Sequence, residues 1–266
     1  MKKLLVSLLV VCLLVAVLPS AEALSLQVGS TAVSNISIYN STTYVPIRTI
    51  SLLLCPGASV TWENNQAVVR TSNLTVTARP GAYYINANGR MLYAADGVKL
   101  VNGTTLVPIR VIAKAMGASV TWNASAQKAI VTLGSGTIAS GDQYYSSDAV
   151  YWLSRIINAE SSGESLKGKI AVGNVILNRV ASSDFPNSIY GVIFDKTGGT
   201  QFTPVANGTI YNAPSSDSIL AAKLCLDGAS VAGSSLFFLN PVTATSSWIT
   251  KNRPYVTSVG NHAFYA

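Results

Sequence analysis

A glutamate at the end of an apolar helix is the residue best placed to do chemistry in this sequence. In the segment AVYWLSRIINAE (149–160), Glu160 follows Leu153 by seven positions and Ile156 by four, which puts all three on one helix face. A carboxylate on a buried face is costly unless it stays protonated, is paired or opens into a cleft. A partly apolar pocket raises the pKa of such a group, which can then donate a proton near neutral pH. We predict that Glu160 is a general acid, and a buried, ion-paired glutamate is the alternative.

No second carboxylate is clearly paired with Glu160. Glu164 lies four positions later in a glycine-bearing loop, where we expect a solvated carboxylate or a charge at the start of the next helix. A glycosidase of the lysozyme type usually uses two carboxylates, an acid and a base or nucleophile. Five other acidic residues of the second half show no paired spacing: Asp148, Asp184, Asp195, Asp217 and Asp227.

The counts of histidine and cysteine argue against other hydrolytic chemistries. His262 is the only histidine of the chain, whereas a zinc hydrolase needs two or three imidazoles. Cys225 lies inside the apolar segment ILAAKLCL (219–226), where an inert packed thiol is expected rather than a nucleophile. We therefore predict no metal site and no cofactor. His262 is expected to be a structural hydrogen-bonding residue, with a place in the cleft as the alternative.

The helices that must position Glu160 belong to the second half of a chain long enough for two domains. The chain has 266 residues, 49% of them hydrophobic and only 11% charged, which excludes a disordered tail or a coiled coil. The segment KGKIAVGNVILNRVASS (167–183) is so apolar that its helix must be central. Glu160 thus ends one buried helix just before another begins.

The first half contains an internal repeat. TTYVPIRTI (42–50) recurs as TTLVPIRVI (104–112), and GASVTW occurs at 57–62 and again at 117–122. Each copy predicts a strand, a short helix opened by Pro-Ile-Arg, a glycine in the left-handed conformation at the helix end, and a second strand. The arginines of the two copies, Arg48 and Arg110, are expected to be structural.

The N-terminus and the charge distribution indicate an exported protein with two unlike halves. Residues 1–23 combine Lys2 and Lys3, an apolar run and an Ala-Glu-Ala end, which predicts a cleaved signal peptide and no membrane span afterwards. A retained N-terminal anchor is the alternative. Residues 24–140 carry eight basic and two acidic groups, and residues 141–266 carry eight of each. The positive charge therefore belongs to the repeat half.

The repeat half resembles the N-terminal domain of copper amine oxidases, over residues 24–134. The resemblance implies a β-rich module. Copper needs several imidazoles, and no histidine precedes position 262, so we expect a wall-binding or spacing module. The small, polar residues that follow predict a linker over 135–146.

The second half is similar to the SleB-type cell-wall hydrolase domain, over residues 147–266. The resemblance rests on six ordered motifs: AESSGE (159–164), VILNRV (175–180), DFPNSIYGVIF (184–194), TQFTPVANGTI (200–210), FFLNPVTATSSWI (237–249) and RPYVTSVGNHAFY (253–265). It implies a compact, lysozyme-like, mainly helical domain with a small β-hairpin, in which the family's catalytic glutamate corresponds to Glu160. The predicted fold class is therefore α+β in two domains.

The same resemblance supplies candidate sugar contacts, which are Gln201, Phe202, Thr203, Asn240 and Trp248. Phe202 and Trp248 can equally be core residues. Relatives often have a tyrosine before the Asn-Pro pair, whereas Phe237-Phe238-Leu239 offers no hydroxyl here. If that hydroxyl has a role, another residue must supply it, for example Tyr190 or Tyr255.

The resemblance implies a secreted, cell-wall- or spore-associated lytic transglycosylase that cleaves peptidoglycan, in spore cortex lysis or in wall remodelling. Its mechanism needs a single carboxylate, which agrees with the lone Glu160. A hydrolytic muramidase and a non-catalytic wall-binding protein are the alternatives. The expected partner is peptidoglycan, and export argues against a nucleic-acid partner.

Overall fold

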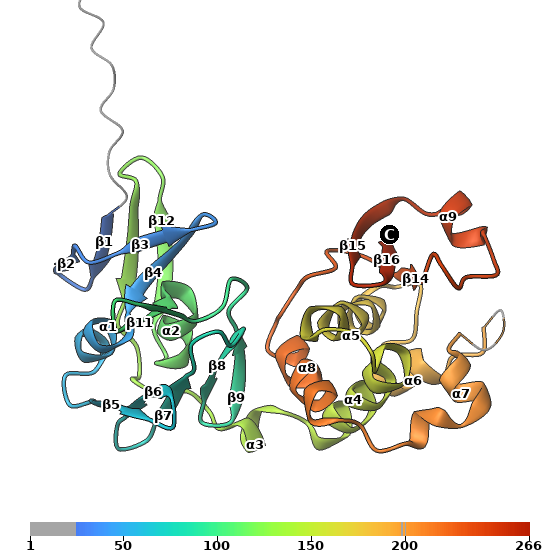
Figure 1. The fold of residues 1–266 in the computed structure, drawn as a ribbon, viewed down its shortest axis with the longest axis horizontal. Helices are drawn as coiled ribbons and strands as arrows, with labels where there is room; N and C mark the ends of the chain where they lie inside the picture. Colours follow the sequence, from blue (N-terminus) through green and yellow to red (C-terminus); the bar gives the residue numbers. More distant parts are fainter. Residues whose placement is uncertain (1–24, 198, 200) are drawn as a thin grey trace, which may run out of the picture.

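The computed structural model describes residues 25–197, 199 and 201–266. The predicted signal peptide, residues 1–23, lies outside the described residues. The repeat and the predicted catalytic half form two units that meet along one side (Figure 1). No helix in the described part of the chain has the length and apolarity needed to cross a membrane.

The N-terminal unit is built mainly of short strands. Its elements are β1 (Ser25–Val28), β2 (Thr31–Val33), β3 (Ser37–Tyr39), β4 (Thr42–Pro46), α1 (Ile47–Leu54), β5 (Ser59–Glu63), β6 (Gln66–Arg70), β7 (Thr75–Ala78), β8 (Tyr84–Ala87), β9 (Arg90–Tyr93), β10 (Lys99–Val101), β11 (Thr104–Pro108), α2 (Ile109–Ala115), β12 (Ser119–Asn123) and β13 (Lys128–Thr132). The strands form three sheets, ordered β12-β13-β1-β2, β10-β11-β4-β3 and β5-β6-β7-β8-β9. One hydrophobic core joins these sheets and both helices.

The two copies of the repeat lie side by side. Strands β4 and β11 pair antiparallel, with Val45 opposite Val107. In each copy the arginine after the proline donates to a carbonyl of the following strand: Arg48 to Val60 at 2.7 Å, and Arg110 to Val120 at 2.9 Å. The structural role predicted for both arginines is confirmed.

The two copies end their helices differently. Gly117 has a φ of +66° and closes α2 in the left-handed conformation, as predicted. The prediction is wrong for Gly57, which is outside the left-handed region. Helix α1 instead ends at Leu54, and Cys55 follows in an extended conformation, with its N–H donating to the Ser51 carbonyl.

The C-terminal unit is mainly helical. Its elements are α3 (Gly141–Tyr144), α4 (Ser147–Ser161), α5 (Leu166–Ala181), α6 (Ile189–Phe194), α7 (Thr203–Asn207), the 3-10 helix η1 (Thr209–Tyr211), α8 (Ser216–Leu226), β14 (Phe237–Leu239), α9 (Trp248–Asn252), β15 (Tyr255–Val259) and β16 (His262–Tyr265). Helices α4, α5 and α8 pack against one another around the core. The predicted hairpin is β15–β16, and β14 adds to it as a third strand. The predicted α+β class, with a β-rich and a mainly helical part, is confirmed.

Serine caps fix where the two helices beside Glu160 begin. The Ser146 hydroxyl accepts from the backbone N–H of Ala149 at the start of α4. The Ser165 hydroxyl does the same for Gly168 at the start of α5. Glu160 therefore lies in the last turn of α4, and a short loop separates it from the central helix.

A buried carboxylate joins the two units. The fully buried side chain of Asp227 accepts from Arg90 at 2.5 Å, from Lys114 at 3.0 Å and from the Tyr145 hydroxyl at 2.7 Å. Burial opposes the ionisation of Asp227, but these hydrogen bonds outweigh it and lower its pKa. Because Arg90 and Lys114 come from the repeat half, the pairing ties it to the C-terminal unit.

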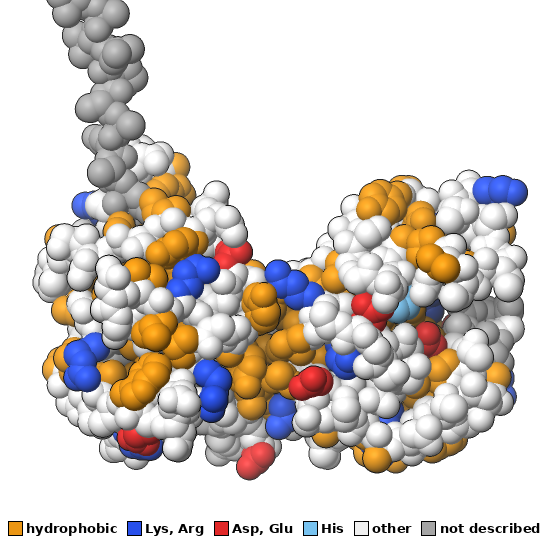
Figure 2. All heavy atoms as spheres, viewed as in Figure 1, with side chains coloured by type: hydrophobic (Ala, Val, Ile, Leu, Met, Phe, Trp, Pro, Cys, Tyr) orange, Lys and Arg blue, Asp and Glu red, His pale blue; other side chains and the backbone are white. Residues whose placement is uncertain are grey.

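Apolar contacts and the connecting segment extend this interface. Tyr84, Met91 and Tyr93 pack against the core of the C-terminal unit. Figure 2 shows hydrophobic side chains where the units meet, below a notch between them. Within the segment predicted as a linker, Gly141 donates its N–H to the Asn88 carbonyl at 2.7 Å. The segment therefore packs along the repeat half.

Candidate active site

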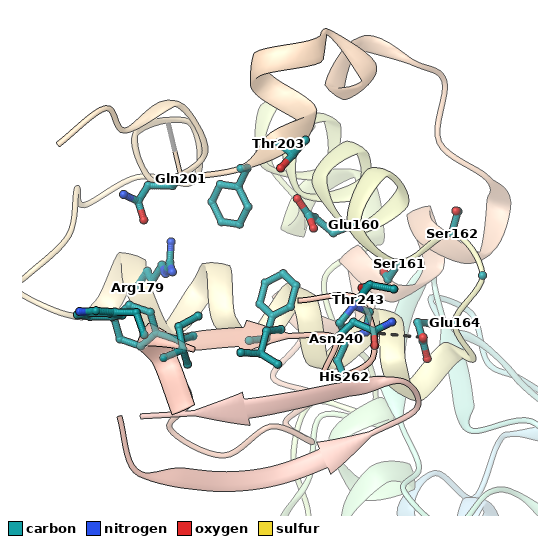
Figure 3. Close-up of a pocket in the computed structure, with 17 residues that line it drawn as sticks. Glu160, Ser161, Ser162, Glu164, Arg179, Gln201, Thr203, Asn240, Thr243 and His262 are labelled. Atoms are coloured by element: carbon teal, nitrogen blue, oxygen red, sulfur yellow. Dashed lines mark ion pairs between the residues drawn. The ribbon is translucent and has the colours of Figure 1, made fainter. Parts of the chain in front are cut away.

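A cleft of about 650 Å³ opens in the C-terminal unit, between the end of α4 and the small sheet (Figure 3). Its walls come from five places in the sequence: the end of α4 with the α4–α5 loop, the last turn of α5, the start of α7, the region from β14 to α9, and β16. The residues that line it are Glu160, Ser161, Ser162, Gly163, Glu164, Arg179, Gln201, Phe202, Thr203, Phe237, Phe238, Leu239, Asn240, Thr243, Trp248, Ile249 and His262.

Glu160 reaches this cleft with a carboxyl group suited to proton transfer. Its side chain is partly buried and has no hydrogen bond or ion pair with another described residue. Burial raises the pKa of Glu160 to about 7, because it disfavours the charged form. The ion-paired alternative is therefore wrong, and the group can exchange a proton near neutral pH.

Glu160 lies where two hollows meet. A second cavity of about 430 Å³ shares Glu160, Ser162 and Thr203 with the first. Asparagines also line it, namely Asn158, Asn207 and Asn212. An extended polymer can therefore pass Glu160 with parts of its chain in both cavities.

The predicted sugar contacts lie together around the same cleft. Gln201 and Thr203 lie on one side of the cleft and Asn240 on the other (Figure 3), and Phe202 and Trp248 also belong to its lining. Phe202 is only 4% exposed and also belongs to the core, so it is a core residue at the cleft wall. Trp248 is 52% exposed and is not a core residue. Their roles as sugar contacts stay predictions.

Neither tyrosine proposed to supply a hydroxyl lines the cleft. Tyr190 stacks on Phe194, with ring centroids 4.4 Å apart, and Tyr255 contacts Ser258 through its hydroxyl at 3.0 Å. Both belong to other surfaces of the unit. The cleft hydroxyls come instead from threonine and serine side chains, namely Ser161, Ser162, Thr203 and Thr243.

The expectation of a solvated Glu164 is wrong. Its side chain is 7% exposed and accepts hydrogen bonds from the backbone N–H and the side-chain amide of Asn261, at 3.3 Å and 2.9 Å. His262 lies beside it, with Nδ1 3.6 Å from a carboxylate oxygen. Burial lowers the pKa of His262, and Glu164 opposes this shift. The β15–β16 turn, 97 residues away in the chain, therefore covers Glu164.

Replacing Glu164 with alanine is expected to destabilise the protein by about 0.5–1.5 kcal/mol, the net contribution of a hydrogen bond, because Asn261 is exposed and its donors can bond to water instead. Denaturant unfolding of the variant measures this loss. Glu164→Gln keeps an acceptor oxygen and serves as the milder control. Unchanged stability of the alanine variant would show that the turn does not depend on Glu164.

Sequence reasoning missed Arg179 and Thr243 among the residues of the cleft. The argument that identified Glu160 also applies to Arg179, because Arg179 is a charged residue in an apolar helix. Thr243 carries no such signal, since it follows β14 in a polar loop. Within the described ranges, no three His, Cys, Asp or Glu side chains gather as a metal site requires.

Two family profiles match this chain, one in each half. Residues 163–265 match the cell wall hydrolase family, and residues 29–131 match the copper amine oxidase N-terminal domain. Residues 163–265 are therefore similar to the cell wall hydrolases, and both predicted family resemblances are confirmed. The hydrolase match begins three residues after Glu160.

The relatives are spore cortex-lytic enzymes. That of Bacillus cereus is 40% identical over 120 residues, which are 45% of this chain and 45% of that enzyme, and that of Bacillus subtilis is 38% identical over 120 residues, 45% of this chain and 38% of that enzyme. The chain thus spans less than half the length of these two relatives. A solved structure, the catalytic domain of the germination-specific lytic transglycosylase SleB from Bacillus anthracis, is 38% identical and matches 48% of this chain and 100% of its own, with a TM-score of 0.43.

Proposed function

We propose that this protein cleaves peptidoglycan as a lytic transglycosylase, at the bond between N-acetylmuramic acid and N-acetylglucosamine. One observation carries the proposal: the unpaired, partly buried carboxyl group of Glu160, with its raised pKa, lies where two cavities meet. The match of residues 163–265 to the cell wall hydrolases supports the same substrate class.

Glu160 serves first as acid and then as base. The protonated carboxyl group donates its proton to the glycosidic oxygen, and the bond from that oxygen to C1 of the muramic acid breaks. The resulting carboxylate then takes the proton of the C6 hydroxyl of the same sugar, as O6 bonds to C1 and closes a 1,6-anhydro ring. No water enters the products, and the attacking hydroxyl is already held beside C1.

Hydrolysis by two carboxylates is the second candidate, because Glu164 also lines the cleft. The hydrogen bonds from Asn261 already engage its carboxylate, which makes it a poor base. We therefore favour the mechanism that uses Glu160 alone.

Mass spectrometry of the products tests this function. Digestion of purified peptidoglycan is expected to release fragments about 18 mass units lighter than hydrolytic ones, because the anhydro ring replaces the added water. Fully hydrated fragments would indicate a muramidase. No release of fragments by the folded protein would indicate a wall-binding protein. Parallel digests of spore cortex and vegetative wall would identify the substrate, and we propose the cortex because the relatives are spore cortex-lytic enzymes.

The activity is expected to fall as the pH rises above about 7. The general acid must carry its proton when the substrate binds, and burial raises the pKa of Glu160 to about 7. Initial rates on soluble glycan strands, measured from about pH 5 to about pH 9, test for this fall in activity. The same fall in activity should be seen with the Glu164→Gln variant. A rate that climbs steadily through this range would contradict the assignment of Glu160.

We also propose that the repeat half retains the enzyme on the anionic wall and that the whole protein is exported. The repeat half carries eight basic and two acidic groups, and this net positive charge supports an electrostatic attraction to the wall. Salt screens such an attraction over about 8 Å at physiological ionic strength. Two of its cations, Arg90 and Lys114, already pair with Asp227.

The inactive Glu160→Gln variant of the full chain should pellet with insoluble wall at low salt and be released as sodium chloride approaches roughly 0.5 M. Co-sedimentation across a salt series measures this release. Pelleting that does not depend on salt would indicate a specific saccharide pocket, and no pelleting at any salt would leave a spacer role.

A further inference from the structure

Arg179 is a buried cation at the wall of the cleft. It lies in the last turn of α5, is 5% exposed, and donates from Nε to the Leu236 carbonyl at 2.7 Å. Its guanidinium carbon lies 4.8 Å from the ring centre of Phe185 and 5.3 Å from those of Phe202 and Phe237. These contacts hold the guanidinium in one orientation.

Within the described structure, the guanidinium lacks a partner for its charge. Among the described residues, Nη1 is buried without a hydrogen-bond acceptor, and no carboxylate lies within 4.0 Å of any of its nitrogens. Burial lowers the pKa of Arg179 to about 10, an effect that Asp195 opposes, so the group stays charged at neutral pH. A buried charge of this kind is costly unless an anion compensates it.

The position of Arg179 indicates where such an anion would come from. In Figure 3, Arg179 and Gln201 lie toward one end of the cleft, Glu164 and His262 lie toward the other, and Glu160 lies between them. A glycan strand bound across Glu160 therefore brings one of its units to Arg179. In such a strand only the muramic acid units carry carboxyl groups, on the lactyl ether itself or on the peptide attached to it.

We propose that Arg179 binds a carboxylate of the muramic acid unit and so determines which sugar occupies this end of the cleft. Nε already donates to the Leu236 carbonyl and Nη1 is buried, so the remaining nitrogen, Nη2, would make the charge-assisted hydrogen bond to the carboxylate. A strand bound in the opposite register would present N-acetylglucosamine, which has no carboxylate, to the buried cation. The inference rests on the proposed action on peptidoglycan.

The test compares native and amidated glycan strands as substrates for the full protein. Carbodiimide coupling to ammonia neutralises the carboxylates and leaves the glycan intact. For Arg179→Gln we expect KM on native strands to rise about 10- to 100-fold, the range of a charge-assisted hydrogen bond, with a smaller change in kcat. On amidated strands the variant and the wild type should have the same KM. An equal rise on both substrates, or none on either, would overturn the proposal.

Two kinds of native strand distinguish the source of the carboxylate. Strands that keep their peptides present peptide carboxylates, and strands freed of peptide by an amidase present the lactyl carboxylate. A rise in KM confined to one kind identifies the group that Arg179 binds. The matched control is Arg253→Gln, since Arg253 lies 4.4 Å from the same Phe237 ring but is exposed and does not line the cleft. It should keep the wild-type dependence on amidation.

A separate measurement covers the case in which Arg179→Gln fails to fold. N-acetylmuramic acid should inhibit the wild type more strongly than its methyl ester does, and equal inhibition by the two would overturn the proposal. Wild type that cleaves no strand would instead show that the proposed function is wrong.

Discussion

Glutamine at position 160 is expected to lower peptidoglycan cleavage by at least about 10²-fold, the scale of a general acid. The amide is close in size to the carboxylic acid and fits the same partly buried place, but it neither donates the proton to the glycosidic oxygen nor takes one back. The release of soluble fragments from purified peptidoglycan, followed over time, measures the loss. Glu164→Gln is the matched control, because it neutralises the other glutamate of the cleft, and it should keep most of the activity.

The stability of Glu160→Gln distinguishes a catalytic role from a structural one. The pKa of Glu160 is raised from its ordinary 4.5 to about 7 in the folded protein, so folding favours the protonated form. This contribution to the stability of the wild type is fully present below pH 4.5, the pKa of Glu160 in the unfolded chain. It is lost as the pH rises through about 7, the pKa in the folded protein. Glutamine stays neutral, and the variant should melt at a higher temperature than the wild type above this pH. Retained activity in Glu160→Gln with loss in Glu164→Gln would identify Glu164 as the acid.

Replacing Asp227 with asparagine is expected to destabilise the contact between the two units by about 3–5 kcal/mol, the cost of breaking a buried ion pair. The change leaves Arg90 buried without its carboxylate, and the Arg90 side chain is only 9% exposed. Denaturant unfolding measures the loss. Cleavage by a protease between residues 134 and 141 should also accelerate, because Tyr145, just after this segment, loses the carboxylate to which its hydroxyl donates.

Lys114→Gln is the control for this prediction. The Lys114 side chain is 47% exposed, so water can solvate the groups that lose their partner. The expected loss in the free energy of unfolding is therefore at most about 1 kcal/mol. Equal effects of the two substitutions would show that burial of Asp227 does not matter for the interface. An unchanged rate of proteolysis in Asp227→Asn would show that the apolar contacts of Tyr84, Met91 and Tyr93 hold the units together without it.

Local pattern was enough to predict several parts of the fold and one residue of the candidate site. The repeated strand–helix–strand unit could be predicted because its prolines, glycines and periodic apolar residues all lie within about twenty residues of one another. Glu160 was readable because a carboxylate on a buried helix face is unusual whatever the helix packs against. The arginines of the repeat followed from their position after a helix-opening proline.

The tertiary structure decided how each charged group is paired. Glu164 looked solvated because its covering turn lies 97 residues away, and Asp227 showed no link to the repeat half because Arg90 lies 137 residues away. Arg179 had the same local signal as Glu160, but its lack of a partner in the described structure depends on the aromatic rings brought around it by β14 and α7. Spacing along the chain determined which helix face each charge occupies. The electrostatic environment that sets the chemistry of a charge comes from residues distant in sequence, and only the packed fold brings them within a few ångströms.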